Sequence, residues 1–249
     1  MKTGYAPVNG LQLYYEIRGA GQPLVLLHGG GSTINTSFGP MLAALAKTRM
    51  VIAFDQQGHG RTADVDRPFS FRQSADDALA LIQFLKIDKA DFMGYSNGGH
   101  IAIQIALSYP ESVRRLIIES AMFSREGGDP SFWESFRNAK LDAMPSELRQ
   151  AYLAEAPHPE NLQSFFDKSV HRMLNFKGWS TDEIRSIQAP TLILLGDRDI
   201  VRLEHAVEMF RLLPRGQLAI LPNADHMQIV KRADWTVPLL EAFLNAPAS

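Results

Sequence analysis

The chain has 249 residues, of which 45% are hydrophobic and 21% charged, and its formal net charge is −2. These values are typical of a globular protein with one sizeable α/β domain, and the mixed charges favour neither nucleic acid nor a membrane surface as a partner. The absence of cysteine excludes disulfides, thiolate catalysis and zinc–cysteine sites. The N-terminus lacks the apolar segment of a signal peptide, and no apolar run is long enough to span a membrane. We therefore expect a cytoplasmic protein.

The first elements predicted along the chain are two strands, around residues 4–8 and 11–18, in which apolar and polar residues alternate. Asn9-Gly10 between them is a strong signal for a hairpin turn. Five short, continuous apolar runs follow: PLVLLHG (23–29), MVIAFD (50–55), ADFMGYS (90–96), VRRLIIES (113–120) and PTLILLGD (190–197). Such runs are typical of strands buried on both faces of a parallel sheet.

Helical periodicity separates these runs and predicts helices at 41–47, 70–85, 98–109, 203–212 and 235–244. Alternation of strands and helices implies right-handed crossovers and a doubly wound sheet. In such a sheet, ligands bind at the carboxyl ends of the strands.

The alternation stops between about residues 122 and 187. This stretch contains many aromatic residues, and we predict that it forms helices and no buried strand. We interpret this stretch as a helical insertion that covers the ligand site. The chain then divides into an α/β core, formed by 1–121 and 188–249, and a helical cap, formed by 122–187.

The stretch GYSNG, from Gly94 to Gly98, lies between a predicted strand and a predicted helix. A G-x-S-x-G sequence at such a junction is the pattern of a nucleophile elbow, in which a sharp turn exposes the serine hydroxyl above the sheet. We therefore predict Ser96 as a nucleophile.

Three glycines, Gly29, Gly30 and Gly31, follow the strand that ends at His28. Glycines let backbone N–H groups approach a substrate oxygen, and each such donor contributes about 2.7–4 kcal/mol to stabilising a developing oxyanion. We predict an oxyanion hole formed by the N–H groups of Gly30 and Asn97, with Gly31 as a further candidate. The alternative is a simple turn at the strand exit.

A base and an orienting acid are predicted farther along the chain. His226, in LPNADHMQIV, follows the last strand and completes the chain order Ser…Asp…His, whereas its neighbour Asp225 is poorly placed to reach the ring. The strand end LILLGDRDIV offers two acids, Asp197 and Asp199, and Glu119 at the end of LIIES is a third.

The other histidines are predicted to be structural. We expect His28 and His59 to brace loops, His100 to hold the helix after the elbow, and three to be solvated or to cap helices: His158, His171 and His205. None has metal-ligand spacing, and no G-x-G-x-x-G follows the first buried strand. The sequence therefore predicts no metal, nucleotide or other cofactor.

The segments HGGGST, DQQGHGRT, GYSNGG, GDRD and ADH occur in the order found in the α/β-hydrolase superfamily, which the chain resembles over essentially its whole length. It looks most like bacterial members with a small helical cap, near carboxylesterases, enol-lactonases and non-haem peroxidase-like hydrolases. The resemblance implies an eight-stranded, mostly parallel sheet with an N-terminal antiparallel hairpin.

The resemblance also orders the candidate acids. Similar enzymes use the second Asp of G-D-x-D, so Asp199 is the first choice and Asp197 the second; Glu119 is third, because some relatives take the acid from that strand. A serine at the elbow disfavours the haloalkane dehalogenase and epoxide hydrolase branches. Asn97 departs from the commoner Met, Leu or Gln after the nucleophile, which makes its side chain a candidate for shaping the pocket.

The function expected from these features is a serine hydrolase (EC 3.1.1) that cleaves a small to medium, partly apolar carboxylic ester or lactone through an acyl-enzyme. Its only expected partner is this small molecule, and the oligomeric state, monomer or dimer, stays open. The residues expected to line the pocket are Gly31, Tyr95, Met122, Phe123, Trp133, Phe136, Met144, Met173, Val201 and Met227. The alternatives are carbon–carbon bond hydrolysis, perhydrolysis or amide cleavage on the same triad, or a slow-turnover small-molecule receptor.

Overall fold

The computed structural model describes residues 1–247 and contains an eight-stranded sheet in the order β1-β2-β4-β3-β5-β6-β7-β8. The pairs β1–β2 and β2–β4 are antiparallel and the remaining pairs are parallel. The predicted mostly parallel sheet with an N-terminal hairpin is therefore confirmed. The strands are β1 (Lys2–Val8), β2 (Leu11–Arg18), β3 (Gln22–Leu27), β4 (Arg49–Phe54), β5 (Ala90–Tyr95), β6 (Val113–Glu119), β7 (Thr191–Arg198) and β8 (Gly216–Asp225).

The hairpin turn follows from its two central residues. Asn9 and Gly10 have φ values of 49° and 81°. A two-residue type I′ turn requires positive φ at both positions, and Asn-Gly is the pair that adopts this conformation most readily.

The last two residues of the predicted core segment 188–249 lie outside the described range.

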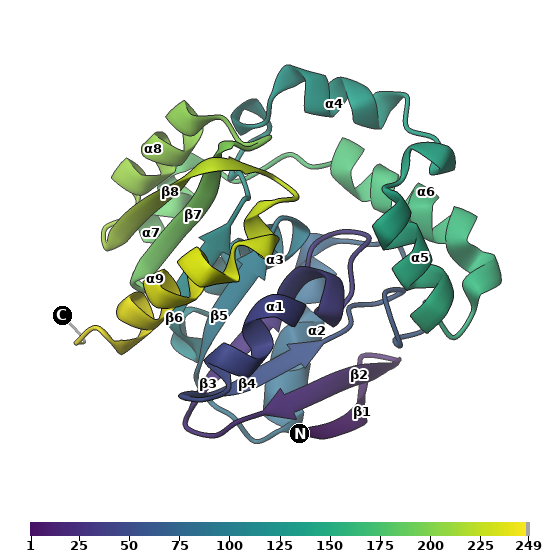
Figure 1. The fold of residues 1–249 in the computed structure, drawn as a ribbon, viewed down its shortest axis with the longest axis horizontal. Coiled ribbons are helices and arrows are strands. Elements are labelled where there is room, and N and C mark those ends of the chain that lie inside the picture. The colour runs from purple at the N-terminus through teal and green to yellow at the C-terminus, as the bar shows by residue number, and fades with distance from the viewer. Residues whose placement is uncertain (248–249) are drawn as a thin grey trace.

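Helices cover both faces of the sheet (Figure 1). On one face, α1 (Ile34–Leu45) and α9 (Ala233–Asn245) pack over one apolar cluster of the sheet. On the other, α2 (Phe71–Phe84), α3 (Asn97–Ser108) and α8 (Leu203–Leu212) pack over a second. These helices agree with the predictions within about two residues, except for α1.

Helix α1 begins at Ile34, whereas the sequence predicted a start at residue 41. At its N-terminus, the Thr33 N–H donates to Thr36 Oγ1 over 2.8 Å. Pro40 lies inside the helix and removes one N–H donor, which costs about 3 kcal/mol in a helix interior. Phe38 and Met41 are fully buried against the sheet, so tertiary packing overrides the local signal.

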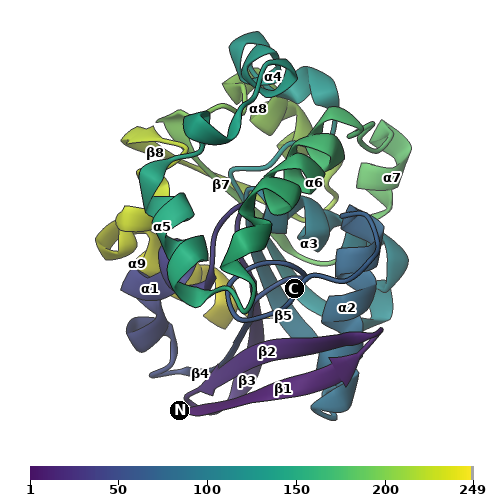
Figure 2. The same cartoon turned by 90° about the vertical axis from the view of Figure 1, so that its right-hand side faces the viewer.

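Between β6 and β7 the chain forms four α-helices within the described residues: α4 (Pro130–Arg137), α5 (Ser146–Glu155), α6 (Leu162–Leu174) and α7 (Thr181–Ser186). Figure 2 shows α4, α5 and α6 in the upper part of the view, above the β1–β2 hairpin. In contrast, α7 packs against α3 and α8, and Ile184 belongs to the apolar cluster on the face of the sheet that these two helices cover. The division at 122 and 187 stays a prediction, and this packing favours a cap that ends before α7.

Across residues 1–247, none of the helices combines the length and apolar character needed to cross a membrane. The cellular location expected from the sequence stays a prediction.

Candidate active site

Ser96 lies in a sharp turn between β5 and α3, with φ 53° and ψ −115°. The turn requires small neighbours. A Cβ atom on Gly94 would lie 2.0 Å from the carbonyl oxygen of Gly98, and one on Gly98 would lie 1.8 Å from that of Leu27. Because real Cβ atoms do not approach oxygen so closely, glycine at both positions is what allows the strained serine conformation.

The Ser96 side chain meets two residues that are far away in the sequence. Its Oγ lies 2.9 Å from Nε2 of His226, and Nδ1 of the same ring lies 2.8 Å from Oδ1 of Asp199. The three residues follow β5, β7 and β8, which all end at the same edge of the parallel sheet. The arrangement can deprotonate the serine hydroxyl and stabilise the imidazolium that forms.

Asp199 is the acid that the fold brings to His226. Its other oxygen, Oδ2, accepts a hydrogen bond of 2.5 Å from Ser120, and the backbone N–H of Val201 donates to Oδ1 over 3.2 Å. Burial alone would raise the pKa of this carboxyl, but the hydrogen bond and charge of His226, helped by Ser120, leave the pKa below its usual value. The exposed Asp197 instead accepts a hydrogen bond from the N–H of Ala224.

Gly30 and Asn97 lie side by side next to the serine. A Cβ atom on Gly30 would be in contact with Cβ of Asn97, at 3.5 Å, and both residues line the same cavity as Ser96. Asn97 is the first residue of α3, where backbone N–H groups have no acceptor within the helix. The site can therefore direct N–H donors and the positive end of a helix dipole at a developing oxyanion.

A buried network holds the loop that carries Gly30. Nε2 of His28 accepts a hydrogen bond from the N–H of Gln56, so the proton is on Nδ1, which lies 2.8 Å from the Gly29 carbonyl oxygen. Burial lowers the pKa of His28 to about 4, in agreement with a neutral ring. The Gln56 amide also donates to the His28 carbonyl and accepts from the Asn97 side chain. Gln56 thus connects the loop that carries Gly30 with Asn97, the two sides of the predicted oxyanion hole.

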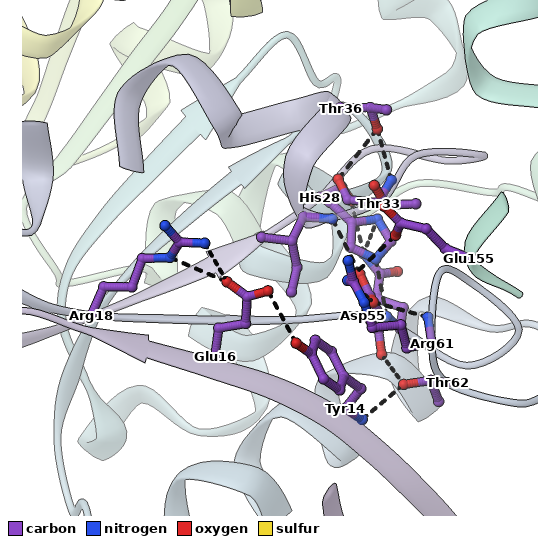
Figure 3. Close-up of polar contacts among 12 residues, drawn as sticks. Tyr14, Glu16, Arg18, His28, Thr33, Thr36, Asp55, Arg61, Thr62 and Glu155 are labelled. Atoms are coloured by element: carbon purple, nitrogen blue, oxygen red, sulfur yellow. Dashed lines mark hydrogen bonds and ion pairs between the residues drawn. The ribbon is translucent and has the colours of Figure 1, made fainter. Parts of the chain in front are cut away.

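Asp55 connects this loop to the cap (Figure 3). Its Oδ1 accepts from the N–H of Ile34, at the start of α1, over 3.1 Å, and its Oδ2 pairs with Arg61 at 3.2 Å. The Arg61 guanidinium also lies 3.3 Å from Glu155 of α5. One buried carboxylate therefore fixes the start of α1 and, through Arg61, one end of the cap.

A cavity of about 330 Å³ opens above the serine. The cap supplies most of its wall, from α4, α5 and α6, and most of the lining side chains are apolar. Phe136, Met144 and Met173 are on this wall, and Gly31, Tyr95 and Met227 lie on the side of the body. The size and lining fit a small or medium molecule with an apolar part.

The sequence profile of the Alpha/beta hydrolase family matches residues 24–239. The chain belongs to this family.

Individual relatives of this chain are named as hydrolases, which supports a hydrolase activity for this protein. Serine hydrolase BPHL from Homo sapiens is 30% identical over an alignment that covers 96% of this chain and 84% of that protein. The 2-hydroxymuconate semialdehyde hydrolase of Pseudomonas sp. (strain CF600) is 28% identical, with 94% and 91% covered. A solved meta-cleavage product hydrolase from Pseudomonas fluorescens IP01 is 27% identical and superposes with a TM-score of 0.82 over 98% of this chain and 97% of that one.

Four residues expected at the pocket of this alpha/beta hydrolase are placed elsewhere: Met122, Phe123, Trp133 and Val201. They are buried in the core that joins the cap to the body. Trp133 donates its indole N–H to the Arg125 carbonyl, and Val201 supports Asp199 through its backbone. Aromatic and methionine content predicted an apolar wall but could not tell which apolar residues hold the cap in place.

His205, which the sequence predicted to be solvated or to cap a helix, is instead buried against Phe123. It is 5% exposed, its ring stacks on Phe123 with centroids 4.2 Å apart, and its Nε2 accepts the Phe123 N–H over 3.1 Å. Conversely, Ser120, Gln56 and Arg172 are at the site although no role there was predicted for them from the sequence, and the only sign was that Gln56 belongs to the segment DQQGHGRT. Their roles depend on contacts between segments far apart in the sequence.

Glu119 lies behind the triad and is fully buried. Neither carboxyl oxygen has a hydrogen-bond partner among the described residues. Burial, with a smaller contribution from the charge of Asp199, raises its pKa to about 8. At neutral pH the carboxyl is protonated, which does not suit the role of anionic partner to His226.

We expect Glu119 to make the protein less stable as pH rises from about 4.5 to about 8. In this window the unfolded chain loses the Glu119 proton while the folded protein keeps it, so the free energy of unfolding falls by up to about 1.4 kcal/mol per pH unit. Glu119→Gln should remove this slope. Urea unfolding at pH 5, 6.5 and 8 measures it, with the exposed Glu134→Gln as a control. Parallel pH curves for wild type and Glu119→Gln would contradict the assignment.

Proposed function

We propose that this protein is a serine hydrolase that cleaves a carboxylic ester or lactone through an acyl-enzyme. Ser96 is the nucleophile, His226 the general base and acid, and Asp199 the residue that orients His226. The N–H groups of Gly30 and Asn97 form the oxyanion hole. The observation that carries this proposal is the continuous hydrogen-bonded series from Ser96 through His226 to Asp199 at the floor of the cavity.

In the first half-reaction, Oγ of Ser96 attacks the carbonyl carbon while Nε2 of His226 takes the hydroxyl proton. The tetrahedral oxyanion accepts hydrogen bonds from the two N–H groups. The carbon–oxygen bond to the leaving group then breaks, and His226 gives its proton to the departing alcohol. In the second half, His226 deprotonates a water that attacks the acyl carbon, and the proton returns to Oγ of Ser96.

Arg172 indicates the charge of the substrate. It lines the cavity from α6 and is 6% exposed, and its Nε has no hydrogen-bond partner among residues 1–247. Burial lowers its pKa to about 9, which still leaves the guanidinium protonated at neutral pH. A buried cation is unfavourable unless an anion accompanies it. We propose that a carboxylate of the substrate takes this place.

The same cation favours carbon–carbon hydrolysis as a second candidate function. Two relatives are named for 2-hydroxymuconate semialdehyde and for meta-cleavage products. The semialdehyde carries a carboxylate and no ester, so its hydrolysis must break a carbon–carbon bond. The triad and the unpaired Arg172 suit this chemistry as well as that of an anionic ester.

A substrate panel tests both candidates. We would measure hydrolysis of p-nitrophenyl esters from acetate to octanoate, of esters and lactones that carry a free carboxylate, and of 2-hydroxymuconate semialdehyde. Turnover of esters, with an acyl adduct on Ser96 trapped by acid quench and seen by mass spectrometry, supports the first candidate. Turnover of the semialdehyde alone supports the second. A folded protein that turns over no member of the panel would contradict both.

Arg172→Met is expected to separate anionic from neutral substrates. Loss of a charge-assisted hydrogen bond costs about 1.5–3 kcal/mol, so kcat/KM for a carboxylate-bearing substrate should fall by roughly 10- to 150-fold. For a neutral ester of the same size, kcat/KM should change by less than about threefold. The control is Arg149→Met, which removes an exposed arginine from the same cap. Equal losses for anionic and neutral substrates would argue against a carboxylate at Arg172.

A further inference from the structure

A second cavity, of about 310 Å³, lies beside the first, between the body and the cap. The body contributes residues 68–72 and Gln104, and the cap contributes the end of α6 and the chain up to Trp179. We call it the seam cavity. Its lining contains no acidic residue, and it includes the basic side chains of Arg72, Arg172 and Lys177 and the imidazole of His171.

Arg172 lines both cavities. Its guanidinium carbon lies 5.3 Å from the ring centroid of Phe69 and 5.5 Å from that of Phe71, both of which line the seam cavity. A Cβ atom on Gly30 would be 3.7 Å from Nη2, so this end of the guanidinium faces the catalytic side. Because Nε has no partner among residues 1–247, the cation has donor capacity left for a second anion.

The other cations of the seam cavity differ in how far they are neutralised. Arg72 pairs with Asp76 at 3.0 Å. The exposed Lys177, by contrast, belongs to none of the ion pairs found within residues 1–247. Lys177 and Arg172 therefore leave two positive charges at one cavity that no carboxylate of residues 1–247 neutralises.

Most of the apolar side chains that line the seam cavity are aromatic. Phe71 and Phe176 pack edge to face with centroids 5.6 Å apart, and Phe176 and Trp179 are also 5.6 Å apart. These rings surround His100, which is 2% exposed and neutral because burial lowers its pKa to about 3. The ring cluster adds apolar surface and no opposing charge.

We propose that the seam cavity is a second ligand site, which binds a small aromatic carboxylate. The ring packs against the wall formed by Phe71 and Trp179, and the carboxylate is held between Lys177 and Arg172. Two cations favour an anion, and flat aromatic side chains favour an aromatic ring over an inorganic ion. This site requires no turnover at Ser96, so it goes beyond the proposed function, and it shares Arg172 with the catalytic cavity.

The probe is 4-bromobenzoate, because its bromine gives an anomalous signal in a crystal. We expect a bromine peak beside Trp179, separate from any peak near Ser96. In solution, calorimetry should give a Kd near or below about 1 mM for this small ligand, and the neutral 4-bromobenzamide should bind at least about tenfold more weakly.

Lys177→Gln should weaken 4-bromobenzoate binding by roughly three- to tenfold. The matched control, Lys140→Gln, removes an exposed cap lysine outside the seam cavity and should leave Kd unchanged. A bromine peak only in the catalytic cavity, equal binding of the benzamide, or equal Kd values for Lys177→Gln and Lys140→Gln would each overturn the proposal.

Discussion

Replacing Ser96 by alanine is expected to lower kcat by a factor on the order of 10⁶, because the serine, base and acid act as one unit. The Ser96 hydroxyl lies in the sharp turn at the end of β5, 2.9 Å from His226 Nε2. Without Oγ, no acyl-enzyme can form, and only the oxyanion donors and binding contacts remain. These contribute roughly 10³- to 10⁴-fold over the reaction in water. The measurement is kcat for the best ester of the panel.

Two other serines that line the cavity serve as controls for Ser96→Ala. Ser135 and Ser169 line it, but their hydroxyls donate to the carbonyls of Phe132 and Phe165 within the cap helices. Since neither hydroxyl is next to a base, Ser135→Ala and Ser169→Ala should retain kcat within about threefold. Thermal unfolding of the three variants shows whether each is folded. If Ser96→Ala is folded and turns over within tenfold of wild type, another nucleophile is at work.

Asp199→Asn is expected to lower kcat by about 10⁴-fold. Asp199 accepts a hydrogen bond from Nδ1–H of His226, which leaves the Nε2 lone pair directed at Ser96. An asparagine can present its NH₂ group to Nδ1 instead, which favours the tautomer with the proton on Nε2. His226 then cannot take the proton of Ser96, although the fold is preserved.

Asp197→Asn is the matched control, since it makes the same change two residues earlier. Its exposed carboxylate accepts a hydrogen bond from the Ala224 N–H and does not reach His226, so kcat should stay within a few-fold of wild type. Both variants are compared by kcat at saturating substrate and by circular dichroism. A larger loss of kcat in Asp197→Asn than in Asp199→Asn would contradict the proposal, because it would identify Asp197 as the acid that orients His226.

The strands, the hairpin and the elbow could be predicted because each depends on interactions close in sequence. Asn9-Gly10 supplies the two positive φ values of the turn, and the apolar runs mark strands with two buried faces. Similarly, glycine two positions before and after Ser96 marks a sharp turn wherever it occurs between a strand and a helix. The start of α1 was missed because packing of Phe38 and Met41 outweighs the local effect of Pro40.

By itself, then, the sequence determined the parallel sheet, the position of Ser96 and the chain order of the candidate triad. Turns and apolar periodicity depend on residues close together in the chain, so they can be recognised without the fold. The choice between Asp197 and Asp199 needed a resemblance to related enzymes, and only the folded chain shows which carboxylate reaches the imidazole. The tertiary structure alone decided which cap residues line the cavity and that Arg172 lies unpaired between two cavities. Whether a side chain finds a partner depends on segments that meet only after folding, and no spacing along the chain encodes it.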